Sequence, residues 1–242
     1  MSRRSLMALA LLWLFAGAAP AEDPAFAALR TALVDEVRSY GRLDPPPGKD
    51  GLDERVLAAL AAVERHRFVP ERLQSEAYAN HPLPIGHGQT ISQPYIVALM
   101  TDLMAPGPED VVLEVGTGSG YQAAVLAKLV RQVYSIEIIE PLASTAGARL
   151  EQLGYTNVTT RLGDGYFGWQ EHAPFDAIIV TAAASHVPPP LIEQLKPGGR
   201  MVIPVGGRFT VQYLLLLEKT MAGEIRTRQI TAVRFVPLTG EH

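Results

Sequence analysis

A glycine-rich turn preceded by a carboxylate is the first place in this chain where residue types and spacing indicate chemistry. Residues 111–120 read Val-Val-Leu-Glu-Val-Gly-Thr-Gly-Ser-Gly, an apolar run that leads into glycines. Glycine lets a backbone turn tightly and approach a ligand, so Gly116, Gly118 and the adjoining Ser119 indicate a nucleotide-binding turn. The spacing differs from the Gly-x-Gly-x-x-Gly of nicotinamide sites. Glu114 would repel a pyrophosphate but suits the cationic methionine end of S-adenosylmethionine, which we predict as the cofactor.

Carboxylates also follow the next two apolar runs. Glu137 ends the run at residues 132–136, where a carboxylate can accept hydrogen bonds from both hydroxyls of a ribose. Asp164 and Gly165 follow the run at residues 157–161 and fit a loop over an adenine, with Asp164 accepting from the exocyclic amine. Taken alone, Glu137 could be a solvated loop charge and Asp164 a plain turn residue. Their position at successive strand ends favours a shared site, because ligands of open α/β sheets bind there.

Other chemistries lack the residues that they need. The chain has no cysteine, which excludes disulfides, thiolate nucleophiles and cysteine-ligated zinc. His81 and His87 have no further ligands at metal-site spacing, so we predict no metal. Gly-Ser-Gly at residues 118–120 does not match the Gly-x-Ser-x-Gly of a hydrolase nucleophile elbow. The formal net charge of −4, without a basic stripe, predicts that nucleic acid is not a partner.

Short β-rich runs alternate with helical stretches from residue 111 onward. The runs lie at residues 111–115, 132–136, 157–161, 175–181 and 200–205. This alternation predicts βαβ units and a parallel sheet with helices on both faces. Two further runs, at residues 211–217 and 229–236, are separated by a gap too short for a crossover helix, which predicts an antiparallel hairpin. The predicted fold class is α/β, a doubly wound, mostly parallel seven-stranded sheet that ends in this hairpin.

Two amphipathic helices and an irregular segment precede the sheet. Apolar residues recur at helical spacing over residues 24–40, where Gly41 is expected to end the helix, and again over residues 53–64. Residues 44–48 read Asp-Pro-Pro-Pro-Gly and cannot continue a helix. Residues 68–92 are dense in Pro, Gly and His, and their apolar residues follow neither the helical nor the strand periodicity. We therefore predict an ordered loop that carries function. Together these parts predict a small N-terminal helical layer.

The N-terminus has the pattern of an export signal. Arg3 and Arg4 precede an uncharged apolar run at residues 6–16 and small residues that end at Ala21. We predict cleavage after Ala21 and a periplasmic or secreted mature chain with no stable membrane association. An uncleaved anchor is the alternative, and a signal that does not function would leave the chain cytoplasmic. The paired arginines are also typical of twin-arginine signals, so the export route stays open.

The predicted organisation is a signal at residues 1–21, a helical layer with the substrate loop at residues 22–105, and a cofactor-binding methyltransferase domain at residues 106–242.

Several stretches together resemble the protein-L-isoaspartate O-methyltransferase family over nearly the whole chain after the signal. The glycine turn and the Pro-Gly-Gly-Arg at residues 197–200 occur in many methyltransferases, whereas Gly-Gln-Thr-Ile-Ser-Gln-Pro at residues 88–94 is specific to this family. The other matching stretches are Arg-Phe-Val-Pro at residues 67–70, Pro-Leu-Pro-Ile-Gly at 82–86, Ala-Pro-Phe-Asp at 173–176 and Phe-Val-Pro-Leu at 235–238. Asn80 departs from the family pattern, in which Asp is frequent.

The resemblance implies the fold of S-adenosylmethionine-dependent methyltransferases and a set of site residues. Ser92 matches the serine treated as catalytic in the family, and Thr90 and Ile91 belong to the same loop, which is implied to lie over the cofactor and the substrate. Thr239 matches a position near the cofactor. The residues implied to flank the peptide substrate are Ile85, Gln89, Val236 and Pro237.

The implied activity is methyl transfer from S-adenosylmethionine to the α-carboxylate of L-isoaspartyl residues, and the implied partners are damaged proteins and peptides that contain them. A carboxylate is already ionised at neutral pH, so no strong general base is required. The Ser92 hydroxyl would orient this carboxylate. Ser92 could also cap the helix predicted at residues 95–104, either instead of this role or in addition to it. Two other hypotheses stay open: a methyltransferase of the same fold that acts on another nucleophile, and a non-catalytic protein that only binds the cofactor.

Overall fold

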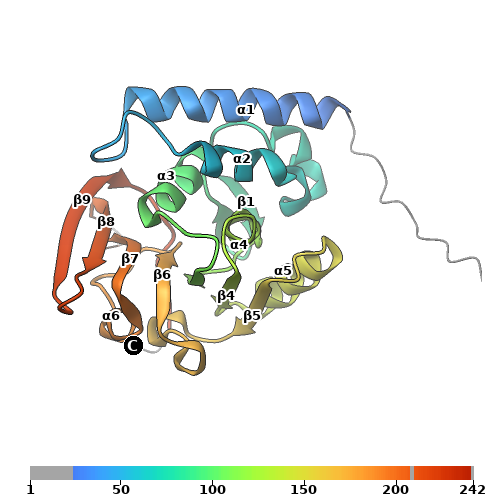
Figure 1. Ribbon diagram of the computed structural model, residues 1–242. Helices are drawn as coiled ribbons and strands as arrows, with labels where there is room; N and C mark the ends of the chain where they lie inside the picture. Colours follow the sequence, from blue (N-terminus) through green and yellow to red (C-terminus); the bar gives the residue numbers. More distant parts are fainter. Residues whose placement is uncertain (1–23, 208–209, 241–242) are drawn as a thin grey trace, which may run out of the picture.

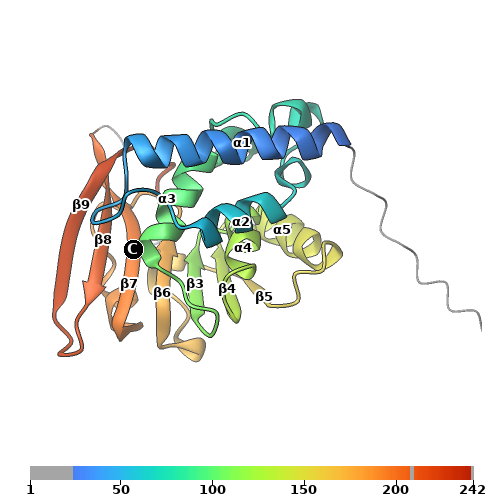
Figure 2. The same cartoon turned by 45° about the horizontal axis from the view of Figure 1, so that its top comes forward.

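A seven-stranded sheet forms the centre of the molecule, in the order β5-β4-β3-β6-β7-β8-β9. The computed structural model describes residues 24–207 and 210–240, so the predicted signal at residues 1–21 lies outside the described residues. Figure 2 shows the strands side by side beneath the helices. They are β3 (Val111–Val115), β4 (Gln132–Glu137), β5 (Val158–Leu162), β6 (Phe175–Val180), β7 (Leu195–Val205), β8 (Gln212–Lys219) and β9 (Ile225–Val233).

The pairing of the strands confirms the predicted fold class. Strands β3 to β7 pair in parallel, and β8 pairs antiparallel with both β7 and β9. Two strands begin earlier than predicted. β7 starts at Leu195 and includes the Pro-Gly-Gly sequence, which is typical of the end of a strand or helix. β9 starts at Ile225, where exposed polar residues give no apolar pattern. Both extensions are supported by pairing with a neighbouring strand and not by local propensity.

Helices cover both faces of the sheet. On one face lie α1 (Pro24–Leu43), α2 (Glu54–Ala62), α3 (Pro94–Met104) and α4 (Tyr121–Ala127), and α1 runs along the top of the view in Figure 1. On the other face lie the short α6 (Pro189–Glu193) and the 3₁₀ turns η3 (Gly165–Phe167) and η4 (Gln170–His172). Helix α5 (Glu140–Gln152) packs against β4 and β5. The described residues therefore form a helix–sheet–helix sandwich.

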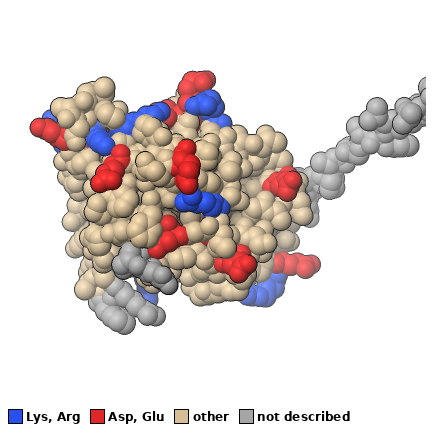
Figure 3. Space-filling view, turned by 90° about the horizontal axis from the view of Figure 1, so that it is seen from below, with Lys and Arg blue, Asp and Glu red and all other residues tan. Residues whose placement is uncertain are grey.

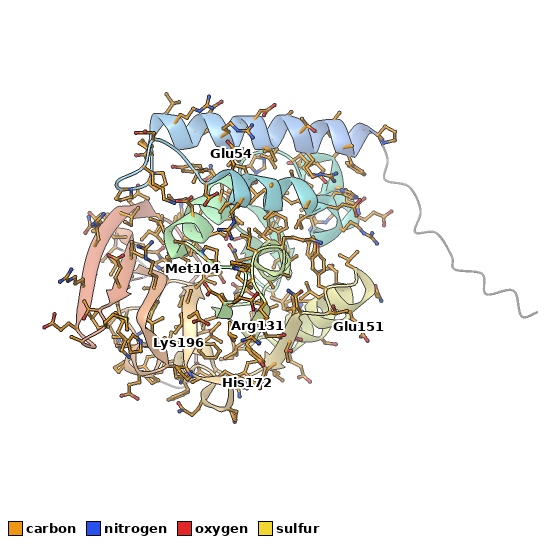
Figure 4. All side chains as sticks on the ribbon, in the orientation of Figure 1. Glu54, Met104, Arg131, Glu151, His172 and Lys196 are labelled. Carbon is orange, nitrogen blue, oxygen red and sulfur yellow. The ribbon has the colours of Figure 1, made fainter. Side chains whose placement is uncertain are left out.

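Helix α1 does not end at Gly41, as the sequence predicts, but continues to Leu43. A Cβ atom at Gly41 would lie 2.7 Å from Leu52 Cγ, so this glycine allows the segment before α2 to pack closely against the helix. The helix ends just before Asp44 and Pro45, since a residue that precedes proline disfavours the helical conformation. An ion pair of 3.1 Å between Arg38 and Glu54, the residue labelled below α1 in Figure 4, joins α1 to α2.

The segment at residues 68–92 contains a small hairpin that was not predicted. After η1 (Arg65–Phe68) and η2 (Glu71–Glu76), strands β1 (Leu83–Gly86) and β2 (Gln89–Ile91) pair antiparallel. The residues between them, His87 and Gly88, have φ angles of 52° and 72°, a left-handed pair typical of tight hairpin turns. With four and three residues, the two strands are too short for a period to be visible in the sequence.

Parallel pairing gives the sheet two distinct ends. Arg131, His172 and Lys196 each lie just before or at the start of a parallel strand. Figure 4 shows these three residues in the lower part of the molecule, away from α1. They mark the amino-terminal end of the parallel strands, so the carboxyl ends of β3, β4 and β6 lie at the opposite end.

The surface of the described residues carries both signs of charge. On the face drawn in Figure 3, acidic and basic side chains are interspersed among uncharged ones. Within residues 24–207 and 210–240, no helix combines the length and apolar character required to span a bilayer.

Candidate active site

A cavity lies at the carboxyl ends of β3, β4 and β6. It measures about 760 Å³, including the part that opens to solvent. Its walls are the glycine turn after β3, the end of β4, the loop from β2 into α3 and the segment after β9. The residues predicted from the sequence that line this cavity are Gln89, Thr90, Ile91, Ser92, Gly116, Gly118, Ser119, Glu137, Gly165, Val236, Pro237 and Thr239.

The glycine turn brings bare backbone to the cavity wall. Gly116 has a φ angle of 97°, and its N–H donates to the carbonyl of Ile136 at 2.8 Å. A Cβ atom at Gly116 would overlap the hydroxyl of Thr181, which donates to the Gly116 carbonyl at 2.6 Å. Any other residue at position 116 would therefore be strained and would displace Thr181. Thr181 itself lines the cavity, and no pattern in the sequence marked it.

Glu137 is the one formally charged residue among the described residues that line this cavity. Its side chain is mostly buried. One carboxylate oxygen accepts from the N–H of Gly118 at 2.8 Å, and the other accepts from the N–H of Ile139 at 2.9 Å. A carboxylate offers about four acceptor positions, so each oxygen can still accept from a ribose hydroxyl. The residues present thus fit an adenosine ligand, and the negative wall fits one that carries a cationic sulfonium.

Glu114 does not line the cavity, although the sequence places it there. Its side chain is fully buried beneath the glycine turn and accepts a hydrogen bond from Ser135, whose hydroxyl lies 2.6 Å from Thr117 Oγ1. Burial raises the pKa of Glu114 to about 8, and the nearby charge of Glu137 acts in the same direction. At neutral pH this carboxyl group is therefore mainly protonated. It supports Thr117 from behind the wall and does not present a negative charge to a ligand.

Asp164 also lies outside the lining of the cavity, whereas Gly165 belongs to it. Asp164 Oδ1 accepts from the N–H of Tyr166 at 2.9 Å and so caps the η3 turn. This contact is the one expected of a plain turn residue. A hydrogen bond between Asp164 and an adenine amine stays a prediction.

A second cleft of about 940 Å³, including its open part, adjoins the cavity. Its walls come from the loop from β2 into α3, the start of α3, and the end of β9 with the segment that follows. Four residues line both spaces: Thr90, Ser92, Thr181 and Val236. Ser92 therefore lies on the wall between two adjoining spaces, one bounded by the glycine turn and the other by the end of β9.

The structure rules out the capping alternative for Ser92. Helix α3 begins at Pro94, and its N-cap residue is Gln93. The N–H of Tyr95, in the first turn of the helix, donates to the side chain of Asn80 at 3.0 Å. The Ser92 hydroxyl makes no hydrogen bond within the described part of the chain, whereas its backbone carbonyl is bonded. The hydroxyl is therefore available to a ligand.

The four residues predicted to flank a peptide differ in their positions. Val236 lines both the cavity and the second cleft. Gln89 and Pro237 line the first cavity only, and Ile85 lines neither space but packs against the core. A direct role for Ile85 in binding a ligand is therefore not supported by its position.

Arg65 supports the Ser92 loop from inside the protein, a role that no pattern in the sequence indicates. Its side chain is fully buried; Nη2 donates to the carbonyl of Ser92 at 2.8 Å and Nε to that of Ala77 at 2.9 Å. The guanidinium also lies 4.8 Å from the ring centre of Tyr121, which lines the cavity. Burial lowers the pKa of Arg65 to about 10, so it stays charged at neutral pH. In the sequence, this arginine resembles the exposed Arg67 beside it.

Residues 47–242 match the sequence profile described as Protein-L-isoaspartate(D-aspartate) O-methyltransferase (PCMT). The chain belongs to this family. Two curated members with the name protein-L-isoaspartate O-methyltransferase 2 are close in sequence. That of Syntrophobacter fumaroxidans is 60% identical over 247 residues, covering 100% of this chain and 100% of that protein. That of Polaromonas sp. is 65% identical over 211 residues, covering 87% of this chain and 97% of that protein.

Solved structures with the same name share the fold of this chain. One of them matches with a TM-score of 0.76 at 28% identity, over 87% of this chain and 66% of that chain. A Plasmodium falciparum structure, described as a protein-L-isoaspartate O-methyltransferase in complex with S-adenosyl-L-homocysteine, matches with a TM-score of 0.72 at 25% identity. That match covers 87% of this chain and 98% of that chain. The resemblance stated from the sequence motifs is confirmed.

Proposed function

We propose that this protein transfers the methyl group of S-adenosylmethionine to the α-carboxylate of L-isoaspartyl residues in damaged proteins and peptides. Membership of the family supports this activity, since relatives that are 60 to 65% identical carry its name. The observation that carries the proposal is the position of Ser92 on the wall between the cavity and the second cleft. A methyl donor on one side of Ser92 and a carboxylate on the other would meet beside its hydroxyl.

We assign the cofactor to the cavity at the glycine turn. The Plasmodium falciparum relative holds S-adenosyl-L-homocysteine, which is the cofactor after loss of its methyl group. In this chain, Glu137 would accept from the ribose, and the backbone of Gly116 and Gly118 would approach the methionine part without side chains in the way. When bound, S-adenosylmethionine supplies a methyl group that is already activated by a positively charged sulfur.

We assign the peptide substrate to the second cleft. An ordinary carboxyl group has a pKa near ~4, so the acceptor is ionised at neutral pH, and the protein need only exclude water and align the oxygen. The Ser92 hydroxyl suits this task because it can donate a hydrogen bond without a competing charge. An isoaspartyl residue adds a methylene to the backbone and leaves its α-carboxylate on a short branch that can reach Ser92.

The test is methyl transfer to an isoaspartyl peptide beside its normal aspartyl twin. We expect methylation of the isoaspartyl peptide and little of the twin. Equal rates would contradict the repair activity and favour a methyltransferase of the same fold with another acceptor. Binding of S-adenosyl-L-homocysteine without turnover on either peptide would favour a non-catalytic cofactor-binding protein.

We also propose that the mature protein acts outside the cytoplasm. The support is the sequence of residues 1–21, with Arg3 and Arg4, an apolar run and a small-residue cleavage site at Ala21. Cell fractionation with N-terminal sequencing is the test, and a mature chain that begins at Glu22 is expected. A full-length chain in the cytoplasm would overturn the export proposal and leave the methyltransferase proposal intact.

A further inference from the structure

We infer that Arg234 makes the second cleft favour isoaspartyl sites that are flanked by acidic residues. The inference rests on the proposed function, since it concerns the peptide that the cleft would hold. It concerns the neighbours of the reacting residue in that peptide, not the reacting carboxylate.

Arg234 is the one formally charged residue among the described residues that line the second cleft. Its side chain is exposed, and the structure gives it no acidic partner within the described ranges. The other lining residues are apolar or uncharged, among them Pro82, Ile96 and Phe235. A cation without a local counter-charge is therefore the dominant electrostatic feature of this cleft. The whole chain carries a net charge of −4, so this cation is a local property.

The backbone that follows Arg234 is held in place by hydrogen bonds. The buried Gln212 binds the next residue, Phe235, twice: its side-chain oxygen accepts from the Phe235 N–H at 2.6 Å, and its amide donates to the Phe235 carbonyl at 3.1 Å. The N–H of Ala183 then donates to the carbonyl of Val236 at 2.8 Å. Arg234 thus lies directly before a fixed stretch of backbone in the wall of the cleft, so its charge stays close to this cleft.

The position of Arg234 relative to Ser92 decides which charge it can attract. Ser92 lines both spaces, whereas Arg234 lines only the second cleft and is absent from the wall of the cofactor cavity. A carboxylate aligned at Ser92 lies where the two spaces meet. The guanidinium is then available to acidic side chains next to the isoaspartyl residue in the peptide.

Arginine at a sheet edge has a simpler explanation, because charged side chains on edge strands prevent unwanted pairing with other chains. β9 is the last strand of the sheet, and Arg228 lies exposed within it, outside the lining of the cleft. Arg228 therefore provides a matched control. It has the same charge and lies on β9 itself, outside the lining of the cleft, whereas Arg234 directly follows β9.

The experiment compares three isoaspartyl peptides that differ only in having Asp, Asn or Lys at the residues beside the isoaspartyl site. Exposed charge pairs are weak, so we expect kcat/KM for the acidic peptide to exceed that for the neutral one by about two- to fivefold. The lysine peptide should fall below the neutral one. The difference should arise mainly in KM and shrink at high salt, because screening weakens exposed pairs.

The variants separate the explanations. Arg234→Gln should bring the acidic-to-lysine ratio of kcat/KM close to one, and Arg234→Glu should reverse it. Arg228→Gln should keep the ratio of the unmodified protein. A ratio that survives Arg234→Gln, or an unmodified protein without any preference, would overturn the inference. No methylation of the neutral isoaspartyl peptide would instead contradict the proposed function.

Discussion

The Ser92 hydroxyl lies on the wall shared by two spaces and is free of other hydrogen bonds within the described residues. We expect Ser92→Ala to lower kcat by about tenfold or more, because a lost hydrogen bond to a charged group typically costs about 1.5–3 kcal/mol. Binding of S-adenosyl-L-homocysteine should change far less, since the hydroxyl is assigned to the carboxylate. Steady-state kinetics with calorimetry measures both, and unchanged turnover in a folded variant would remove Ser92 from the reaction.

For Glu137, unlike Ser92, we expect a substitution to affect binding of the cofactor first. Glu137→Ala should weaken binding of S-adenosyl-L-homocysteine by roughly tenfold or more, because contacts to a ribose are made in both the ground state and the transition state. The carboxylate also accepts from Gly118 and Ile139, so the melting temperature must be followed in parallel. Glu137→Gln keeps one oxygen and should bind with intermediate affinity. A stable Ala variant with unaltered affinity would contradict the ribose role.

Glu114 should make stability depend on pH. Its pKa is raised from 4.5 to about 8 in the folded protein, so between these values the unfolded chain releases a proton that the folded protein keeps. The free energy of unfolding therefore falls as the pH rises across this window. Glu114→Gln cannot titrate. The difference between its melting temperature and that of the unmodified protein should therefore shift by several degrees in favour of the variant as the pH rises from about 5 to 8. If the melting temperatures of the two proteins changed in parallel with pH, this would contradict the raised pKa of Glu114.

At the level of the element, the Ser92 loop depends on a buried arginine. We expect Arg65→Met to lose about 2–4 kcal/mol of stability, since the carbonyls of Ala77 and Ser92 would each lose a charged donor. Thermal unfolding should show a fall of roughly 5–10 °C. Arg67→Met is the control, because Arg67 is half exposed and forms its ion pair with the nearby Glu64. This variant should unfold within about 2 °C of the unmodified protein. Equal losses in the two variants would contradict this role of Arg65.

The strands of the sheet and the helices that cover it were predictable, because burial of one or both faces imposes a spacing of apolar residues on each element. β3 lies in the middle of the sheet, and its uninterrupted apolar run was located to the residue. The hairpin of β1 and β2 was missed because its pairing is set by the turn at His87 and Gly88 and not by a periodic face. Gly41 was misread because a glycine that admits a neighbouring chain has the same appearance in a sequence as one that ends a helix.

The site was predictable only in its outline. Residues on the glycine turn and at the end of β4 follow from the rule that ligands bind at the carboxyl ends of parallel strands. The rule does not say which way a side chain points, so Glu114 was placed on the cavity wall when it lies behind it. Arg65 and Thr181 act through contacts with residues far away in the sequence. Such contacts leave no trace in local spacing.

On the scale of the whole molecule, the pair Arg3 and Arg4 allows a test of the export route. Replacement of Arg3 and Arg4 by lysine should abolish export if the protein uses the twin-arginine route, because that route requires the arginine pair. Passage of a folded chain would carry out one bound cofactor but would not sustain turnover. Fractionation of cells that express the double variant gives the answer. Normal periplasmic delivery of the variant would leave export standing and exclude the folded route.

The wall that the cavity and the second cleft share, formed by Thr90, Ser92, Thr181 and Val236, has a consequence for inhibitor design. A single molecule that joins an adenosine group to a short peptide could occupy both spaces, since they share these four lining residues. The second half would then bind at a high effective concentration, so its affinity should exceed that of either half alone by orders of magnitude. The linker would pass beside Ser92, which lines both spaces.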